Sequence, residues 1–208
     1  MDDKKLNERE SLELITEMIE RTKQRYVGDG NIMLVWGYTS VAVAVLIWVL
    51  LAVTGNPAWN WLWFLIWIIG LGGSKLISRN EREKFGVKSY SDKMTSNLWS
   101  VVGWTAIVSS LLCFAFMFFL GVNSWLTMMV FALVIVPFAE IAQGIVVNEK
   151  TLIAGGAVGL LAGLITICCI TGGVGLKVSW FMPMFIVVFI AMMIIPGHIL
   201  NRKNSAQQ

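Results

Sequence analysis

The chain has 208 residues, of which 57% are hydrophobic and only 14% are charged, whereas soluble domains carry about a quarter of charged residues. The formal net charge is only +3, with 16 basic and 13 acidic residues that lie beside one another along the chain. This pattern lacks the basic stripe typical of nucleic-acid-binding proteins and argues against nucleic acid as a partner. The composition favours a protein that lies in a lipid bilayer.

Residues 7–26 are predicted to form an amphipathic helix within an amino-terminal region, 1–30, that also contains a linker. Asn7 and Glu10 have the spacing of a capping box, and an apolar stripe includes Leu12, Ile15 and Ile19. Residues 1–30 are polar and mixed in charge, unlike a signal peptide, so the first span is expected to remain in the mature protein.

This helix has three candidate docking surfaces: the underside of the bundle, a cytosolic protein and the bilayer surface. Helices that lie on lipid normally have a basic polar face, but five glutamates precede the basic end of residues 7–26. The sequence therefore favours docking on protein, either within the chain or on a partner.

Six apolar stretches follow, each long enough to cross a bilayer core about 30 Å thick, which requires roughly 20 residues of helix. They cover residues 33–54, 58–77, 98–120, 125–147, 152–171 and 178–200. We therefore predict an all-α, polytopic transmembrane helix bundle over residues 31–201, with a loop at 78–97 and a tail at 202–208.

The three turns on one side of this bundle share a Gly followed shortly by a Trp, as in Gly55 to Trp59, Gly121 to Trp125 and Gly175 to Trp180. Indole rings favour the membrane interface, which explains three anchored turns. The alternative is that the chain consists of three related helical hairpins, since Val136-Pro137 in the fourth span resembles Ile195-Pro196 in the sixth.

Basic residues predict the orientation, because short cytoplasmic loops retain Lys and Arg. All of the 16 basic residues except Lys177 fall on one side of the six spans. We therefore expect both termini, the amphipathic helix and the loop at 78–97 to be cytoplasmic.

The fifth span carries Gly155, Gly159 and Gly163 at a spacing of four residues. Small residues at this spacing let helices approach closely in lipid. They predict close packing against another span of the same chain, or alternatively a homodimer contact or a face that lines a substrate path.

Glu140 is the one carboxylate within a predicted span. Gln143 lies one turn further on the same side of the helix, and Pro137, three residues earlier, frees a backbone carbonyl group. Acidic residues inside a membrane are often functional, and burial favours the protonated form of such a carboxyl group. One interpretation is a proton or cation relay.

The alternative role for Glu140 is structural: the neutral carboxyl group hydrogen-bonds Gln143 or a hydroxyl group such as that of Thr105 and fixes helix packing. No Lys, Arg or His lies at comparable depth to complete a charge pair, which weakens the relay. His198, near the cytoplasmic end of the sixth span, is expected to be solvated unless it meets Glu140 in space.

Catalytic and cofactor motifs are absent from the sequence. Cys113, Cys168 and Cys169 lie in apolar stretches without metal-ligand or redox spacing. No phosphate-binding Gly-Lys loop and no nucleophile motif occurs. We therefore expect no cofactor, no metal site and no enzymatic activity.

Three short segments carry a family resemblance: Leu12-Glu13-Leu14-Ile15, Trp36-Gly37-Tyr38 and Pro196-Gly197-His198. With these segments the chain resembles uncharacterised bacterial six-helix membrane proteins with a short polar amino-terminal helix. The resemblance is consistent with a bacterial inner-membrane location and does not indicate any activity.

Two hypotheses of function follow from the sequence. The leading one is a regulatory or scaffolding membrane protein whose cytoplasmic helix and loop engage a partner. The alternative is a small transporter or channel component that uses Glu140.

Overall fold

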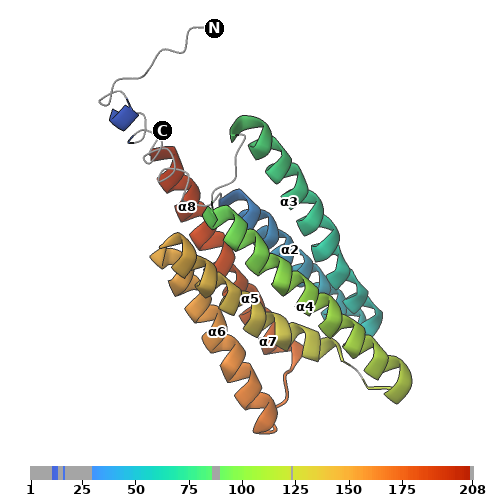
Figure 1. The fold of residues 1–208 in the computed structure, drawn as a ribbon. Coiled ribbons are helices and arrows are strands. Elements are labelled where there is room, and N and C mark those ends of the chain that lie inside the picture. The colour runs from blue at the N-terminus through green and yellow to red at the C-terminus, as the bar shows by residue number, and fades with distance from the viewer. Residues whose placement is uncertain (1–10, 14–15, 17–29, 86–89, 123, 207–208) are drawn as a thin grey trace.

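The apolar stretches of the sequence form long helices in the computed structural model, which describes residues 11–13, 16, 30–85, 90–122 and 124–206 (Figure 1). These residues are helical or form short connections, and none of them is in a strand. Six helical segments are long and apolar enough to cross a membrane. The predicted all-α multi-pass bundle is confirmed, whereas most of the predicted helix at 7–26 lies outside the described residues.

Each span corresponds to one or more labelled elements. In chain order they are α2 (Gly30–Thr54), η1 (Pro57–Trp63), α3 (Phe64–Phe85), α4 (Tyr90–Leu120), α5 (Trp125–Val147), α6 (Lys150–Thr171), α7 (Val178–Phe189), η2 (Ile190–Ile194) and α8 (Ile195–Ala206).

Consecutive spans run in opposite directions, so all short connections lie at one of two ends (Figure 1). We call one of them the basic end; it holds the start of α2 and the end of α8. Its described basic residues are Lys75, Arg79, Arg82, Lys84, Lys93, Lys150, Arg202 and Lys203, whereas Lys177 lies at the opposite end.

The predicted loop at 78–97 is helical where the structure describes it outside the spans, because α3 continues to Phe85 and α4 begins at Tyr90. The predicted tail at 202–208 is likewise helical as far as Ala206. Apolar content decides where a span ends, but the backbone hydrogen bonds of a helix continue through polar residues with good helix propensity, such as Glu, Lys and Arg.

Two spans are not the uniform α-helices that the sequence predicts. The second begins with the 3₁₀ turn η1, in which Pro57 follows the cap residue Asn56, whose side chain accepts a hydrogen bond from the Ala58 N–H (2.9 Å). The sixth is divided by η2, a five-residue π-helical turn that ends two residues before Pro196. Because proline has no N–H and its ring crowds the preceding turn, a wider turn accommodates it.

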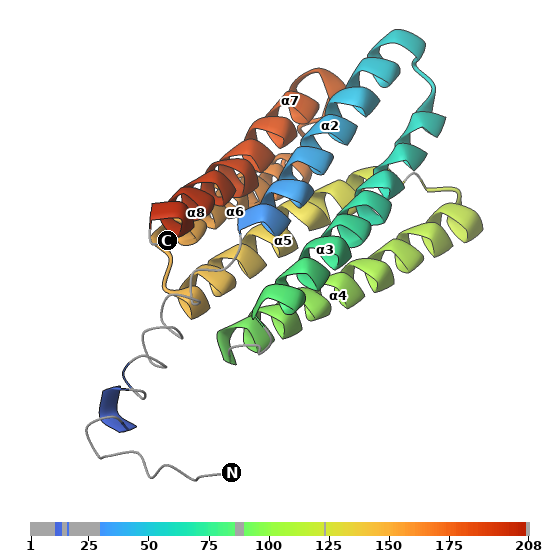
Figure 2. The same cartoon turned by 90° about the horizontal axis from the view of Figure 1, so that it is seen from above.

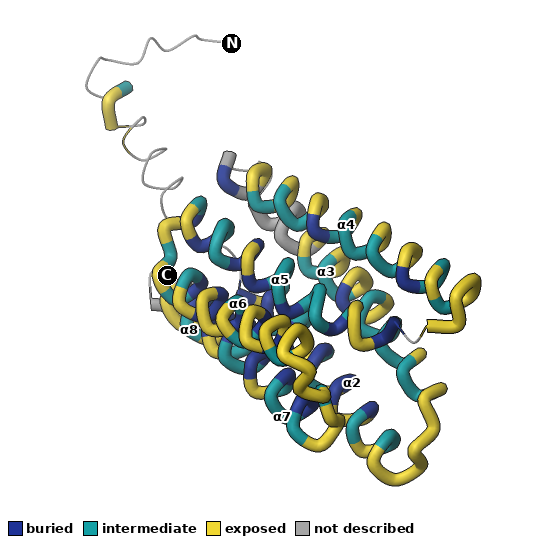
Figure 3. Tube along the Cα trace, turned by 90° about the horizontal axis from the view of Figure 1, so that it is seen from below, coloured by how far each residue is buried: buried dark blue, intermediate teal, exposed yellow. Residues whose placement is uncertain are grey.

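The core lies among α2, α5, α6 and the last span, whereas α3 and α4 lie at one side (Figure 2). Its fully buried residues include Ile47 on α2, Leu133 on α5 and Met192 on η2. The tube in Figure 3 shows the same division, with exposed residues along the outer side of α4. Examples are Val101, Trp104, Leu111 and Phe116, which a bilayer would cover.

The two spans of each sequential hairpin are in contact: α2 with η1 and α3, α4 with α5, and α6 with α7, η2 and α8. Between hairpins, α5 packs closely on α6, and α2 packs on α7, η2 and α8.

Candidate functional site

Glu140 on α5 is completely buried, with 0% of its surface exposed. Its position is defined by Gly155 on α6, where an added methyl group would lie 3.1 Å from Glu140 Oε1, 3.1 Å from Met192 Cα and 3.0 Å from Pro196 Cγ. The carboxyl group therefore lies where α5, α6, η2 and α8 meet. Neither oxygen atom has a hydrogen-bond partner in the described part of the chain.

Two spans that contain proline border this carboxyl group. Pro137, one turn before Glu140, is buried within α5, and Pro196 follows the π-helical turn η2. Each proline removes one N–H from its helix, so a carbonyl group in the preceding turn loses its usual donor. The carbonyl group that Pro137 leaves without its helical donor is that of Leu133, which is seven residues before Glu140 and lies against Gly163 on α6.

The glycine face of α6 makes this convergence possible. Gly155 lies against Met192 and Pro196, and Gly159 lies against Met192 and Pro137. A methyl group on Gly159 would lie 2.8 Å from Met192 Sδ. Gly163 lies against the backbone carbonyl oxygen of Leu133. The face predicted for close packing is thus buried within the chain by α5 and η2, and is not free for a second copy.

Gln143 does not pair with Glu140, although both are on α5. Its Oε1 accepts a hydrogen bond of 2.7 Å from Trp99 Nε1 on α4. Thr105, the other expected partner, donates to the Val101 carbonyl oxygen of its own helix (2.8 Å). The hydrogen bonds proposed for a structural role of Glu140 are therefore not formed.

His198 on α8 is exposed and lies beside Tyr38 on α2, with a hydrogen bond of 2.7 Å between Nε2 and Oη. The two rings are also in edge-to-face contact, with centroids 5.9 Å apart. His198 therefore contacts a neighbouring helix and shares no hydrogen bond with Glu140.

Further polar contacts between helices gather at the basic end. Asn201 on α8 donates to Asn31 on α2 (2.6 Å), and Lys203 forms an ion pair of 2.6 Å with Glu149, between α5 and α6. These contacts cannot be predicted from local sequence, because their partners are distant along the chain. The sequence indicates only that polar residues begin and end these spans.

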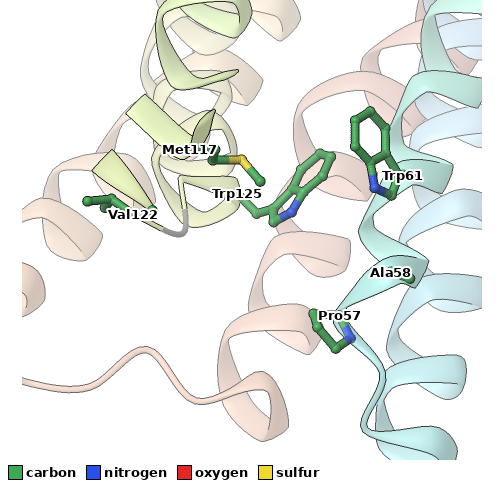
Figure 4. A pocket seen from close by; sticks show the side chains of 7 residues that line it. Pro57, Ala58, Trp61, Met117, Val122 and Trp125 are labelled. Atoms are coloured by element: carbon green, nitrogen blue, oxygen red, sulfur yellow. The ribbon is translucent and has the colours of Figure 1, made fainter. Parts of the chain in front are cut away.

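The opposite end is held by aromatic packing and carries a shallow hollow (Figure 4). Trp61 stacks on Phe114 and meets Trp125 edge to face, with centroids 5.5 and 5.3 Å apart. The hollow beside them has a volume of about 290 Å³. It is lined by Pro57, Ala58, Trp61, Met117, Gly121, Val122 and Trp125, none of which is charged.

The described residues contain no group of three or more His, Cys, Asp or Glu that could hold a metal ion. The chain matches no protein-family model, no curated protein and no solved structure. Function is therefore argued from the contacts around Glu140 and at the basic end.

Proposed function

We propose that this protein is a regulatory or scaffolding component of a bacterial inner membrane, without enzymatic activity of its own. Its cytoplasmic segments, including residues 7–26, engage a cytosolic protein. The distribution of Lys and Arg supports this orientation, because the positive-inside rule assigns the basic end and both termini to the cytoplasm.

The observation that carries the proposal is the closed packing around Glu140. A transporter that used this acid would need a water-accessible path to it, whereas the side chain has no exposed surface and is enclosed by α5, α6, η2 and α8. The hollow of about 290 Å³ lies at the opposite end. A bundle closed in this way suits a protein that acts by binding a partner at its cytoplasmic end and not by passing a substrate through its interior.

The polar contacts at the basic end support the same proposal. The Asn31–Asn201 hydrogen bond and the Glu149–Lys203 ion pair hold together segments that are far apart in sequence. Because both contacts are open to solvent, each contributes only about 1 kcal/mol or less. The surface presented to the cytoplasm is therefore a defined arrangement of helix ends.

Orientation is tested with single cysteines in a variant that lacks Cys113, Cys168 and Cys169. Arg202→Cys should react with an impermeant maleimide only after the cells are opened, and Lys177→Cys should react in spheroplasts. The reverse pattern would refute the orientation and the cytosolic partner with it.

A second candidate function, proton or cation transport, is favoured because Glu140 has no hydrogen-bond partner among the residues that the structure describes. The decisive measurement is proton and monovalent-cation flux in liposomes for the wild type and Glu140→Gln. The regulatory proposal expects no flux from either protein when both are folded. If the wild type shows a flux that Glu140→Gln abolishes, the regulatory proposal is wrong and the protein is a transporter or channel component.

A further inference from the structure

Glu140 occupies an environment that distinguishes sharply between its two protonation states. Both oxygen atoms are buried and have no partner in the described residues. A buried carboxylate without a counter-charge is strongly destabilising, whereas the neutral acid is tolerated at far lower cost. The observed packing is therefore compatible with a bound proton and incompatible with its loss.

No charged side chain of α2, α5, α6, η2 or α8 compensates for ionisation, and Lys93 on α4, which also packs on α5, is exposed. Glu140 is the only charged residue of α5, and α2 and η2 have none. On α6, Lys150 is exposed at the first position. On α8, His198 contacts Tyr38, Lys203 pairs with Glu149, and Arg202 is exposed. None of these described groups is in contact with the carboxyl group.

The wall opposite Glu140 offers neither a donor nor a counter-charge. Glu140 Oε1, Met192 Cα of η2 and Pro196 Cγ of α8 all lie 3.0 to 3.1 Å from the position that a methyl group on Gly155 would take. A carboxylate would therefore face backbone and apolar side chains of η2 and α8 without compensation, whereas the neutral acid is accommodated at far lower cost.

We propose that Glu140 is a proton-binding site, and that loss of the proton separates η2 and α8 from α6 and rearranges the basic end. The inference rests on the proposed regulatory function: the proton is the signal to which the regulatory protein responds. It requires no passage of protons across the membrane.

The route from the site to the basic end is a single helix. Pro196 lines the site at the second residue of α8, and His198, Asn201 and Lys203 follow within two turns. These three side chains contact α2 and the α5–α6 connection. Because a helix moves as a unit, displacement of Pro196 is transmitted to these contacts.

The first experiment measures proton binding directly by infrared spectroscopy of the full chain in nanodiscs over a pH series. The wild type should show the C=O stretching band of a protonated carboxyl group, which should be absent in Glu140→Gln. Glu149→Gln is the matched control, since it removes a carboxylate that is paired with Lys203, and it should retain the band. A wild type without any band assignable to Glu140 would overturn the proposal.

The second experiment measures the distance between spin labels on Lys150→Cys and Arg202→Cys, two exposed positions at the ends of α6 and α8, in a variant without the native cysteines. The distance should lengthen as the band disappears with rising pH. In Glu140→Gln it should stay at the low-pH value throughout.

A band that titrates while the distance stays constant would overturn the coupling to α8. If Glu140→Gln does not fold, the protein with native Glu140 provides the test by itself. A distance between the two spin labels that does not change with pH would then contradict the proposal. Neither measurement involves a partner or the membrane orientation. A negative result in these experiments would therefore not contradict binding of a cytosolic partner, and the absence of such a partner would not contradict the proton site.

Discussion

At the residue scale, single glycines determine how closely α5 and α6 approach. A methyl group on Gly163 would overlap the Leu133 carbonyl oxygen, whereas one on Gly103 would meet nothing within 4 Å. We expect Gly163→Ala to lower the free energy of unfolding by about 1 to 3 kcal/mol, the usual cost of overpacking. Gly103→Ala should be neutral or slightly stabilising. Thermal unfolding in detergent measures both, and equal midpoints would contradict the tight α5–α6 contact.

The Trp99–Gln143 hydrogen bond is the second residue-scale prediction. Trp99→Phe leaves Gln143 Oε1 without its 2.7 Å donor and should cost about 0.6 to 2 kcal/mol. Trp104→Phe is the control, because Trp104 is 67% exposed and should change stability little. In a double-mutant cycle with Gln143→Leu the two losses should not add; additive losses would mean that this bond contributes nothing.

At the element scale, η2 contains one more residue than a regular α-helix would need, because a π-helical turn is an inserted residue that the helix absorbs. Deleting Ala191 together with Pro196→Ala should convert Ile190–Ile194 into α-helix and keep the register of α8. Deleting Val158 should instead turn part of the glycine face of α6 by about 100° relative to the rest. Gel filtration should show a folded protein for the first variant and aggregation for the second; the opposite result would contradict the π-helical assignment.

At the scale of the whole molecule, stability is expected to be uneven. The core cluster takes its fully buried residues from α2, α5, α6, α7, η2 and α8, and its contacts to α3 and α4 involve only partly buried side chains. Backbone amides of α3 and α4 should therefore exchange hydrogen faster than those of α2 and α5 in detergent, by about tenfold, equivalent to ~1.4 kcal/mol of opening free energy. Uniform exchange rates would show that the six spans open as one unit.

Much of the architecture follows from local sequence. Six stretches of about 20 apolar residues predict six membrane helices, and glycines four residues apart predict a close helix contact in α6. The helical state of residues 78–85 and 90–97 was missed, since hydropathy reports where a span leaves the lipid rather than where the helix ends.

The candidate site was predictable only in part. Glu140 is visible in the sequence as an acid among apolar residues, and Pro137 and Pro196 as interruptions. The sequence does not show that Gln143 pairs with Trp99 or that His198 contacts Tyr38, which lie 44 and 160 positions apart. Helical spacing predicts neighbours on one helix, whereas such contacts depend on which helices meet.

The sequence by itself determined the number of spans, their alternating direction and the presence of one acid at depth, because these depend on length, hydropathy and charge along the chain. Only the tertiary structure decided that α6 lies against α5 and η2, that its glycine face is covered from within, and that Glu140 has no partner in the described bundle. The physical reason is that helices in lipid associate through shape complementarity and a few interhelical hydrogen bonds, and neither can be read from one helix alone.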